Sequence, residues 1–238
     1  MKSLKSALKE YKYPGRGIIM GLEKNGNFLI GYFITGRSIS SKNRILKLDS
    51  EGNARTVEFE RNENTKNKDL ILYKAISKFN TYTIITNGNH TDTILDGLKY
   101  EKTFEESLKT RTFEEDPPIF TPRISGILNI ADEKIEYKLS IIKKSSKENS
   151  DNVERFYFEY EGGEKGVGHL IHTYKQQDEN NINSFYGEPT KINLPESFNE
   201  FANTIWLSLN EEYRVSVFVR LIDVKAKKEY TKIINKNS

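Results

Sequence analysis

The chain has 238 residues and a formal net charge of only +3, from 37 basic and 34 acidic side chains. Leu, Ile, Val and Phe make up about a quarter of it, which excludes a disordered chain. No apolar run approaches the roughly 20 residues of a membrane-spanning helix, and the N-terminal segment lacks the apolar stretch of a secretory signal. We therefore expect a cytoplasmic protein with no membrane partner.

The chain contains no cysteine, which excludes disulfides, Cys-type zinc sites, iron–sulfur clusters and thiol nucleophiles. The pI of 8.7 does not by itself indicate nucleic-acid binding. Basic residues are spread along the chain among acidic ones, whereas a nucleic-acid footprint is a clustered stripe. We therefore expect no nucleic-acid partner.

Alternating β-branched and aromatic residues predict that most of the chain is strand. Hairpin turns are predicted at Asn25-Gly26 and at Ser50-Glu51-Gly52-Asn53. In chain order, the predicted strands are 16–23, 28–35, 44–48, 54–59, 82–86, 123–131, 134–142, 154–161, 167–175, 214–223 and 228–234.

Helical spacing of apolar residues is best at 196–209 and weaker at 3–11, 90–100 and 103–111. Two polar stretches, 60–68 and 143–152, are predicted to be exposed loops, and neither is long enough to require a domain boundary. Many antiparallel strands with few helices favour the α+β class. We expect a single domain over residues 1–238.

Several common chemistries lack their residues in this chain. It has no P-loop, no dinucleotide-binding glycine motif after a strand and no nucleophile elbow. The three histidines are His90, His169 and His172, and the last two should point to opposite faces of one strand. We therefore expect no metal site and no cofactor.

Polar residues gather beside glycine and proline turns at 13–17, 32–44, 86–92, 114–123 and 184–189. Arginines mark these strand ends in a chain that otherwise prefers lysine: Arg16, Arg37, Arg44 and Arg123. The planar guanidinium suits bidentate recognition of a phosphate or a carboxamide. The alternative, that each arginine pairs with a surface carboxylate, stays open.

These turns resemble the motifs of the archaeal-type IMP cyclohydrolases, a family that includes bacterial relatives. In the first half of the chain the matching segments are YPGRGI (13–18), YFITGRSISSKNR (32–44), LYKAIS (72–77), TNGNHTDTI (86–94) and EEDPPIFTPRISGIL (114–128). The second half resembles the bacterial branch in GVGHLIHTY (166–174) and SFYGEP (184–189). There it departs from the archaeal pattern, in which His169 and Glu188 are not expected.

The resemblance implies a four-layer αββα sandwich like that of the N-terminal-nucleophile hydrolases. It also implies the final step of purine biosynthesis, in which 5-formamidoimidazole-4-carboxamide ribotide closes to inosine monophosphate with loss of water. Pro14 and Gly15 directly precede Arg16 at the start of the first predicted motif strand, so no Thr, Ser or Cys stands there to act as an N-terminal nucleophile. The reaction needs none, because the carboxamide nitrogen of the substrate attacks its own formyl carbon.

The matching motifs also imply roles for particular residues. Tyr73 and Arg37 are predicted to contact the formyl oxygen, and Glu115 to handle the proton, with Glu114 or Asp116 as alternatives for that role. The predicted substrate-binding residues are Arg16, Tyr32, Asn43, Arg44, Asn87, His90, Asp92 and Arg123. Among these, Arg16, Arg44 and Arg123 are candidates for the phosphate or the carboxamide. Asn87, His90 and Asp92 either contact the base or cap the following helix.

Two other functions remain open at this point: a non-catalytic purine-nucleotide-binding protein, and an amidohydrolase acting on a different formylated substrate. A proton-handling carboxylate favours catalysis, because phosphate binding needs no carboxylate nearby. The sequence leaves open whether the chain forms a homo-oligomer.

Overall fold

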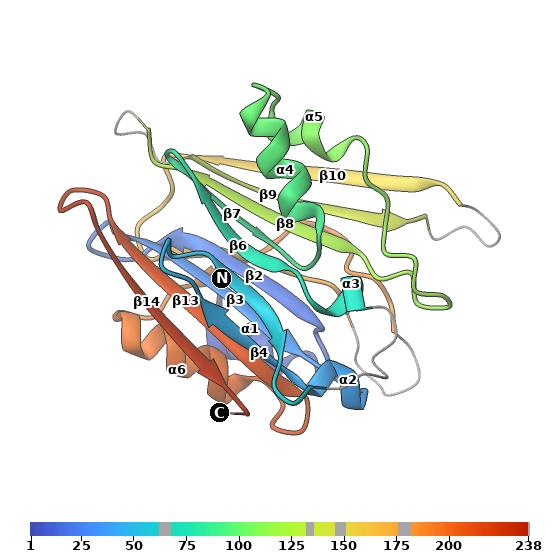
Figure 1. Cartoon of the computed structure of the whole chain (residues 1–238). Helices are drawn as coiled ribbons and strands as arrows, with labels where there is room; N and C mark the ends of the chain where they lie inside the picture. The colour runs from blue at the N-terminus through green and yellow to red at the C-terminus, as the bar shows by residue number, and fades with distance from the viewer. Residues whose placement is uncertain (62–67, 132–135, 146–150, 176–181, 238) are drawn as a thin grey trace.

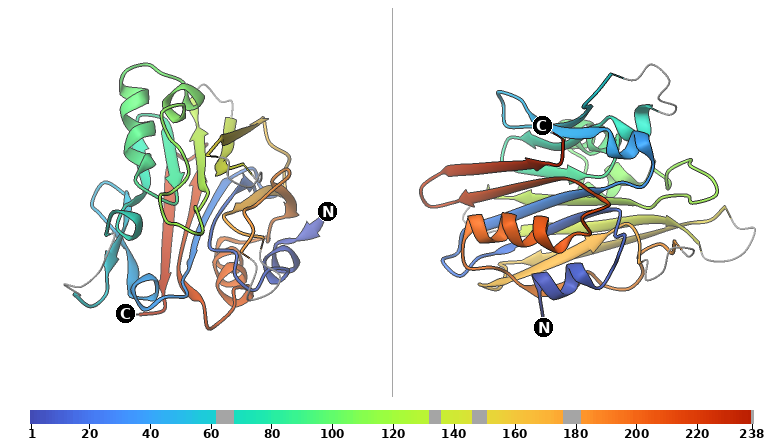
Figure 2. Two further views of the ribbon diagram at one scale, coloured as in Figure 1. Left: turned by 90° about the vertical axis from the view of Figure 1, so that its right-hand side faces the viewer. Right: turned by 90° about the horizontal axis from the view of Figure 1, so that it is seen from below.

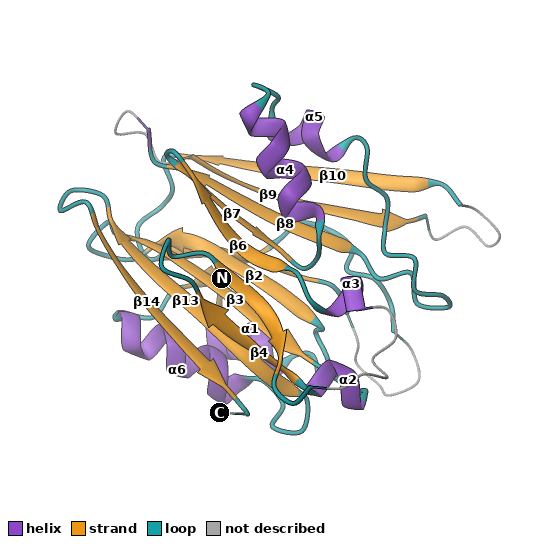
Figure 3. Cartoon of the chain, in the orientation of Figure 1, coloured by secondary structure: helices purple, strands orange, loops and turns teal. Residues whose placement is uncertain are grey.

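Two seven-stranded sheets pack face to face, and helices lie on both outer surfaces (Figures 1 and 3). The computed structural model describes residues 1–61, 68–131, 136–145, 151–175 and 182–237. The first sheet has the order β1 (Lys2–Ser3), β12 (Thr190–Asn193), β11 (Val167–His172), β2 (Arg16–Leu22), β3 (Phe28–Thr35), β13 (Arg214–Asp223) and β14 (Lys228–Asn235).

The second sheet has the order β10 (Val153–Glu161), β9 (Glu136–Lys144), β8 (Arg123–Asn129), β7 (Tyr82–Thr86), β6 (Lys74–Phe79), β5 (Ala54–Glu58) and β4 (Arg44–Leu48). Neighbouring strands are antiparallel in both sheets, apart from the short parallel pair of β1 and β12. The fold is therefore α+β with mostly antiparallel strands, as the sequence predicts.

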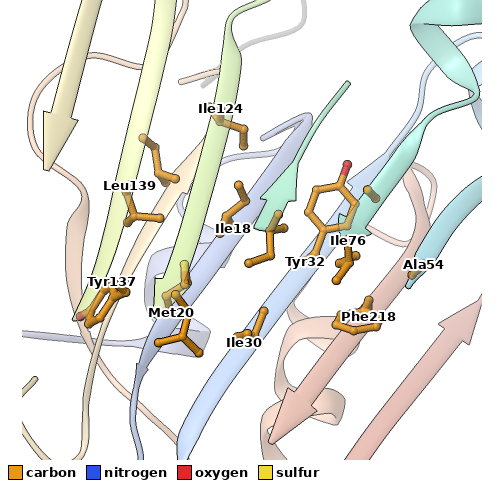
Figure 4. Packing of buried hydrophobic residues seen from close by; sticks show 14 of the residues in the cluster. Ile18, Met20, Ile30, Tyr32, Ala54, Ile76, Ile124, Tyr137, Leu139 and Phe218 are labelled. Carbon is orange, nitrogen blue, oxygen red and sulfur yellow. The ribbon is translucent and has the colours of Figure 1, made fainter. Parts of the chain in front are cut away.

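The largest apolar cluster lies between the two sheets (Figure 4). Met20 and Ile30 of the first sheet face this layer, as do Ile124 and Leu139 of the second, and all four are buried. Strands β2 and β3 are buried on both faces, which explains why their sequences are apolar at nearly every position rather than at alternate ones.

Helices cover both sheets from outside (Figure 2). Helices α1 (Leu4–Lys9) and α6 (Phe198–Ser208) share an apolar cluster with the first sheet, and α4 (His90–Lys99) and α5 (Phe104–Leu108) share one with the second. The remaining helices, α2 (Ile39–Lys42) and α3 (Lys68–Ile71), are single turns. In the described part of the chain, no helix is both long and apolar enough to cross a membrane.

The structure confirms the predicted helices and strands with small differences at their ends. It adds three strands that the pattern missed, β1, β6 and β12, and the single-turn helices α2 and α3. Predicted strand 167–175 ends at His172, and 123–131 ends at Asn129. Parts of three predictions lie outside the described residues: 62–67 and 146–150 of the polar loops, and 134–135 of a strand.

The packing between the sheets predicts the cost of shortening one core side chain. Leu139→Ala removes a fully buried side chain and should lower the free energy of unfolding by about 2–5 kcal/mol. The same substitution at Leu207, which is 68% exposed on α6, should change it by less than about 0.5 kcal/mol. Urea unfolding of both variants checks this, and equal losses would contradict the described packing.

Candidate active site

A buried ion pair joins the two sheets where their polar turns meet. Arg16 is the first residue of β2, and Glu114 lies in the connection between α5 and β8. Nη2 of Arg16 donates to both carboxylate oxygens of Glu114 at 3.1 Å. Both side chains are almost fully buried, so each charge depends on the other for compensation.

The Glu114 carboxylate is only 2% exposed and has further polar neighbours. Nδ2 of Asn87 lies 3.5 Å from its Oε1, and the Glu114 backbone N–H donates to the Thr121 carbonyl at 2.9 Å. Burial raises the pKa of the Glu114 carboxyl above its ordinary value, although the Arg16 and Arg123 guanidiniums oppose that shift. A carboxyl with a raised pKa is suited to exchanging protons near neutral pH.

Arg123, the first residue of β8, is held beside Glu114 by its neighbours. Its Nε donates to the Thr112 carbonyl at 2.9 Å, and its Nη1 approaches Asn89 Oδ1 at 3.3 Å and His90 Nδ1 at 3.4 Å. The other ring nitrogen, His90 Nε2, lies 3.1 Å from the Ile124 carbonyl. Since a carbonyl only accepts, Nε2 carries the proton and Nδ1 can accept from Arg123.

His90 is fully buried, and burial together with Arg123 holds its pKa well below the ordinary value. The neutral ring therefore uses both nitrogens within the protein. Asn87 is engaged in the same way, because its Nδ2 donates to the Pro122 carbonyl and its Oδ1 accepts from the Ile124 N–H. Both residues hold the start of β8 in place.

Gly88 permits this close arrangement. A Cβ atom at this position would lie 2.9 Å from Nη1 of Arg123 and 3.3 Å from both Glu114 Oε1 and His90 Nδ1. The lack of a side chain therefore lets the turn between β7 and α4 approach the charged groups. A substitution here would displace the groups that surround Glu114.

Two tyrosines form a second buried pair in the same region. The hydroxyls of Tyr32 on β3 and Tyr73 before β6 are 2.8 Å apart, and Arg16 interacts electrostatically with both. Within the described residues, Tyr32 is fully buried and its hydroxyl has no other hydrogen-bond partner. Either hydroxyl can be the donor in this bond, and the arrangement in which the more deeply buried Tyr32 donates leaves the Tyr73 proton for a ligand. Burial and Tyr73 both raise the pKa of Tyr32.

A pocket of about 380 Å³ opens beside Tyr73. Its lining includes Lys74, Asn89 and Asp92, so it brings together the LYKAIS and TNGNHTDTI motifs. Asn89 also contacts Arg123, which links the pocket to the buried charges. The volume is within the range of small-molecule sites.

Arg44 lies close to this group, whereas several other predicted site residues lie elsewhere. Arg44 is buried at the start of β4, donates from Nε to the Ser41 carbonyl at 2.9 Å, and partly opposes the rise that burial causes in the pKa of Tyr32. Arg37 is exposed, and its guanidinium stacks 4.8 Å from the ring centre of Tyr13. Asn43 is half-buried, and its side-chain amide bonds only the backbone of Glu60 among the described contacts.

The structure also separates the three neighbouring acids. Glu115, the predicted proton-handling residue, is exposed, whereas the alternative Glu114 is buried between the arginines. Asp116 is half-buried and accepts from the Thr121 N–H and hydroxyl, so it shapes the turn. Asp92 is exposed and pairs with Lys74 at 2.9 Å. It does not cap α4, since Asn89 occupies the N-cap position without a side-chain capping bond.

Sequence reasoning missed Tyr174, whose ring stacks on Tyr13 and whose hydroxyl lies within hydrogen-bond distance of Thr121. Arg16 interacts with it electrostatically. The available signal was the pairing of two strands, because His172 of β11 is opposite Gly17 of β2, which brings the following residues alongside Arg16.

The two histidines of β11 have separate surroundings, as strand alternation predicts. His169 Nδ1 lies 2.7 Å from the Tyr137 hydroxyl, whereas His172 Nδ1 donates to the Tyr174 carbonyl at 2.8 Å. Burial lowers the pKa of each imidazole to about 4. Among the residues that the structure describes, no three His, Cys, Asp or Glu side chains form a group that could hold a metal ion.

The fold and the site define a two-sheet α+β protein with a polar, small-molecule-sized site where the ends of the sheets meet. The chain belongs to the family described as IMP cyclohydrolase-like protein, whose model matches residues 13–228.

Curated relatives match the chain over about half of its length. An IMP cyclohydrolase of Methanococcus maripaludis strain C7 is 32% identical over 120 residues, which cover 49% of this chain and 58% of the relative. IMP cyclohydrolases of Thermococcus kodakarensis and Methanocaldococcus jannaschii are 29% and 30% identical over 120 and 119 residues, covering 56% and 57% of those proteins. In each case the match spans less than two thirds of the relative.

The ion pair predicts how the Glu114 carboxyl titrates. Arg16→Met removes the nearest guanidinium and leaves the carboxyl buried, so the Glu114 pKa should rise further. Carbon-13 NMR of the glutamate side chains across a pH series measures this shift. The exposed Glu115 is the internal control, and an unchanged Glu114 pKa would contradict the described pair.

Proposed function

We propose that this chain is an IMP cyclohydrolase, which converts 5-formamidoimidazole-4-carboxamide ribotide to inosine monophosphate and water in purine biosynthesis. The observation that supports it most is the buried Glu114 beside Arg16, close to the Tyr32–Tyr73 pair. A buried carboxylate weakens the binding of an anionic ribotide, so its presence favours proton transfer over simple binding.

The proposed reaction has three chemical requirements. The carboxamide nitrogen attacks the formyl carbon and forms the new C–N bond, so the amide must lose a proton. The formyl oxygen gains negative charge and needs a hydrogen-bond donor. That oxygen then leaves as water and takes up two protons, one from the carboxamide nitrogen and one from the formamido N–H, whose loss lets the ring C=N bond form. Both reacting groups are on one ring, so holding them in the reactive rotamer supplies part of the rate enhancement.

We assign the proton transfers to Glu114 and the formyl-oxygen contact to Tyr73. Glu114 would accept the carboxamide proton and pass it to the formyl oxygen, and would then carry the formamido N–H proton to the same oxygen as it leaves as water, so the carboxylate ends as it began; a carboxyl with a raised pKa suits this exchange. Tyr73 would donate a hydrogen bond to the formyl oxygen. This moves the proposed proton-handling role from Glu115 to the alternative that the sequence left open.

The substrate would occupy the pocket beside Tyr73, with the guanidiniums of Arg44 and Arg123 as candidates for its phosphate or carboxamide. The predicted contact of Arg37 with the formyl oxygen would require its side chain to leave Tyr13. Asn87 and His90 would act indirectly by holding Arg123 and the start of β8.

We further propose that residues 1–238 form one domain whose layers are arranged like the αββα sandwich of N-terminal-nucleophile hydrolases. Two facing sheets with helices outside each support this likeness. Two expectations stay predictions: the cytoplasmic location and the lack of a cofactor. The sequence leaves open whether the chain forms a homo-oligomer.

One assay tests the function and the assignment of Glu114. The purified chain, given the formamido ribotide, should form inosine monophosphate, followed by absorbance. Glu114→Gln keeps the shape but cannot exchange a proton, so kcat should fall about 10²–10⁴-fold with little change in KM. Glu115→Gln is the matched control and should turn over at the wild-type rate.

Each other outcome has a definite meaning. Ribotide binding without turnover by the wild-type chain would indicate the non-catalytic nucleotide-binding protein. Turnover of another formylated compound alone would indicate an amidohydrolase. Loss of activity in Glu115→Gln but not in Glu114→Gln would return the role to Glu115.

The direction of the Tyr32–Tyr73 hydrogen bond gives a separate prediction. Tyr73→Phe removes the donor to the formyl oxygen and should lower kcat about 10²–10³-fold. Tyr32→Phe leaves that donor in place and removes only the hydroxyl that hydrogen-bonds Tyr73, so its effect on kcat should be clearly smaller. Steady-state kinetics of both variants checks the order, and a larger loss in Tyr32→Phe would reverse the assigned direction.

A further inference from the structure

The segment that carries Glu114 is irregular, and side chains from other elements hold it. Helix α5 ends at Leu108, and the chain then runs through 109–113 to Glu114 without regular structure. Arg155 of β10 reaches the start of this segment. Its Nη2 donates to the Lys109 carbonyl at 3.1 Å and to the Arg111 carbonyl at 2.6 Å.

The Lys109 carbonyl is that of the C-cap residue of α5, where carbonyls lack intrahelical partners, and the Arg111 carbonyl lies two residues beyond it. A guanidinium satisfies them and is also attracted to the negative end of the helix. Helix α5 lies over β10 (Figure 1), where the hydroxyl of Tyr157 also reaches the Glu105 carbonyl and its ring meets Phe104 edge-on. Strand β10 therefore anchors the helix before the segment begins.

The rest of the segment is held in the same manner. Nε of Arg111 donates to Thr93 of α4 at 2.7 Å, and Nε of Arg123 donates to the Thr112 carbonyl at 2.9 Å. The next fixed point is the Glu114 N–H on the Thr121 carbonyl. The Arg155 contacts are thus the first in a continuous series that ends at the carboxylate.

We propose that Arg155 is a positioning residue for Glu114, an inference that rests on the proposed function of that carboxylate. It fixes the backbone at 109 and 111, and so keeps the carboxylate in its position relative to Arg16 and the pocket. Arg155 touches neither the Glu114 side chain nor the pocket lining in the described contacts, so it acts through the segment alone.

The test compares Arg155→Met and Arg155→Lys with a matched control. Arg214→Met removes an arginine that also donates to a carbonyl near a helix C-terminus, that of Trp206 in α6, on the other sheet. Hydrogen exchange of 109–116 is measured relative to α4, together with the Glu114 pKa by NMR and with kcat and KM.

Arg155→Met should speed exchange in 109–116 and shift the Glu114 pKa, and it should lower kcat about ten- to a hundredfold with KM nearly unchanged, as expected for a misplaced catalytic group. Arg155→Lys should recover part of each effect, and Arg214→Met should leave all of them as in the wild type. In a Glu114→Gln background, Arg155→Met should lower kcat little further.

Wild-type exchange and a wild-type Glu114 pKa in Arg155→Met would overturn the proposal, as would an equal effect of Arg214→Met. Failure of the proposed function is distinguishable, because it appears as a wild-type chain that forms no inosine monophosphate. In that case the exchange and the pKa still decide whether Arg155 positions the carboxylate.

Discussion

The ion pair between Arg16 and Glu114 is the constraint on which the site depends. Arg16 begins a strand of the first sheet and Glu114 lies in the connection that leads into the second, and neither charge could be buried alone without a cost of several kcal/mol. The surroundings fit this requirement. A Cβ at position 88 would crowd Arg123, Glu114 and His90, and burial together with the charge of Arg123 favours the neutral form of His90. The pair can form only when the two sheets are correctly aligned, so the same alignment also positions the groups of the site.

Most of the fold could be predicted from local pattern. Strands 28–35 and 214–223 have the predicted bounds, because their ends coincide with turn residues and their side chains are typical of strands. Strand β6 was missed because three consecutive residues, Ala75, Ile76 and Ser77, are all buried, so the pattern lacks the alternation of a half-exposed strand. The packing of the two sheets against each other depends on contacts between segments that are distant in the sequence, and hydrophobic periodicity gives no information about such contacts.

The site was predictable as a set of motifs but not as a geometry. Resemblance brought Arg16, Tyr73 and the acidic turn together, and the structure places Arg16 beside that turn. The choice between Glu114 and Glu115 depends on a backbone conformation held by Thr121, by Arg123 and by the more distant Arg155, and spacing carries no information about it. Tyr174 was missed for a similar reason, since its neighbours come from strand pairing across more than half of the chain.

Strand β10 is an edge strand of the second sheet and pairs only with β9 among the described strands. Edges of a sheet open locally with less free energy than its centre, because they have fewer backbone hydrogen bonds to break. Arg155 extends from this edge to the segment that carries Glu114. Warming would therefore increase the mobility of the segment that carries Glu114 before the two sheets unfold. Heat inactivation would then begin below the temperature at which the whole chain unfolds.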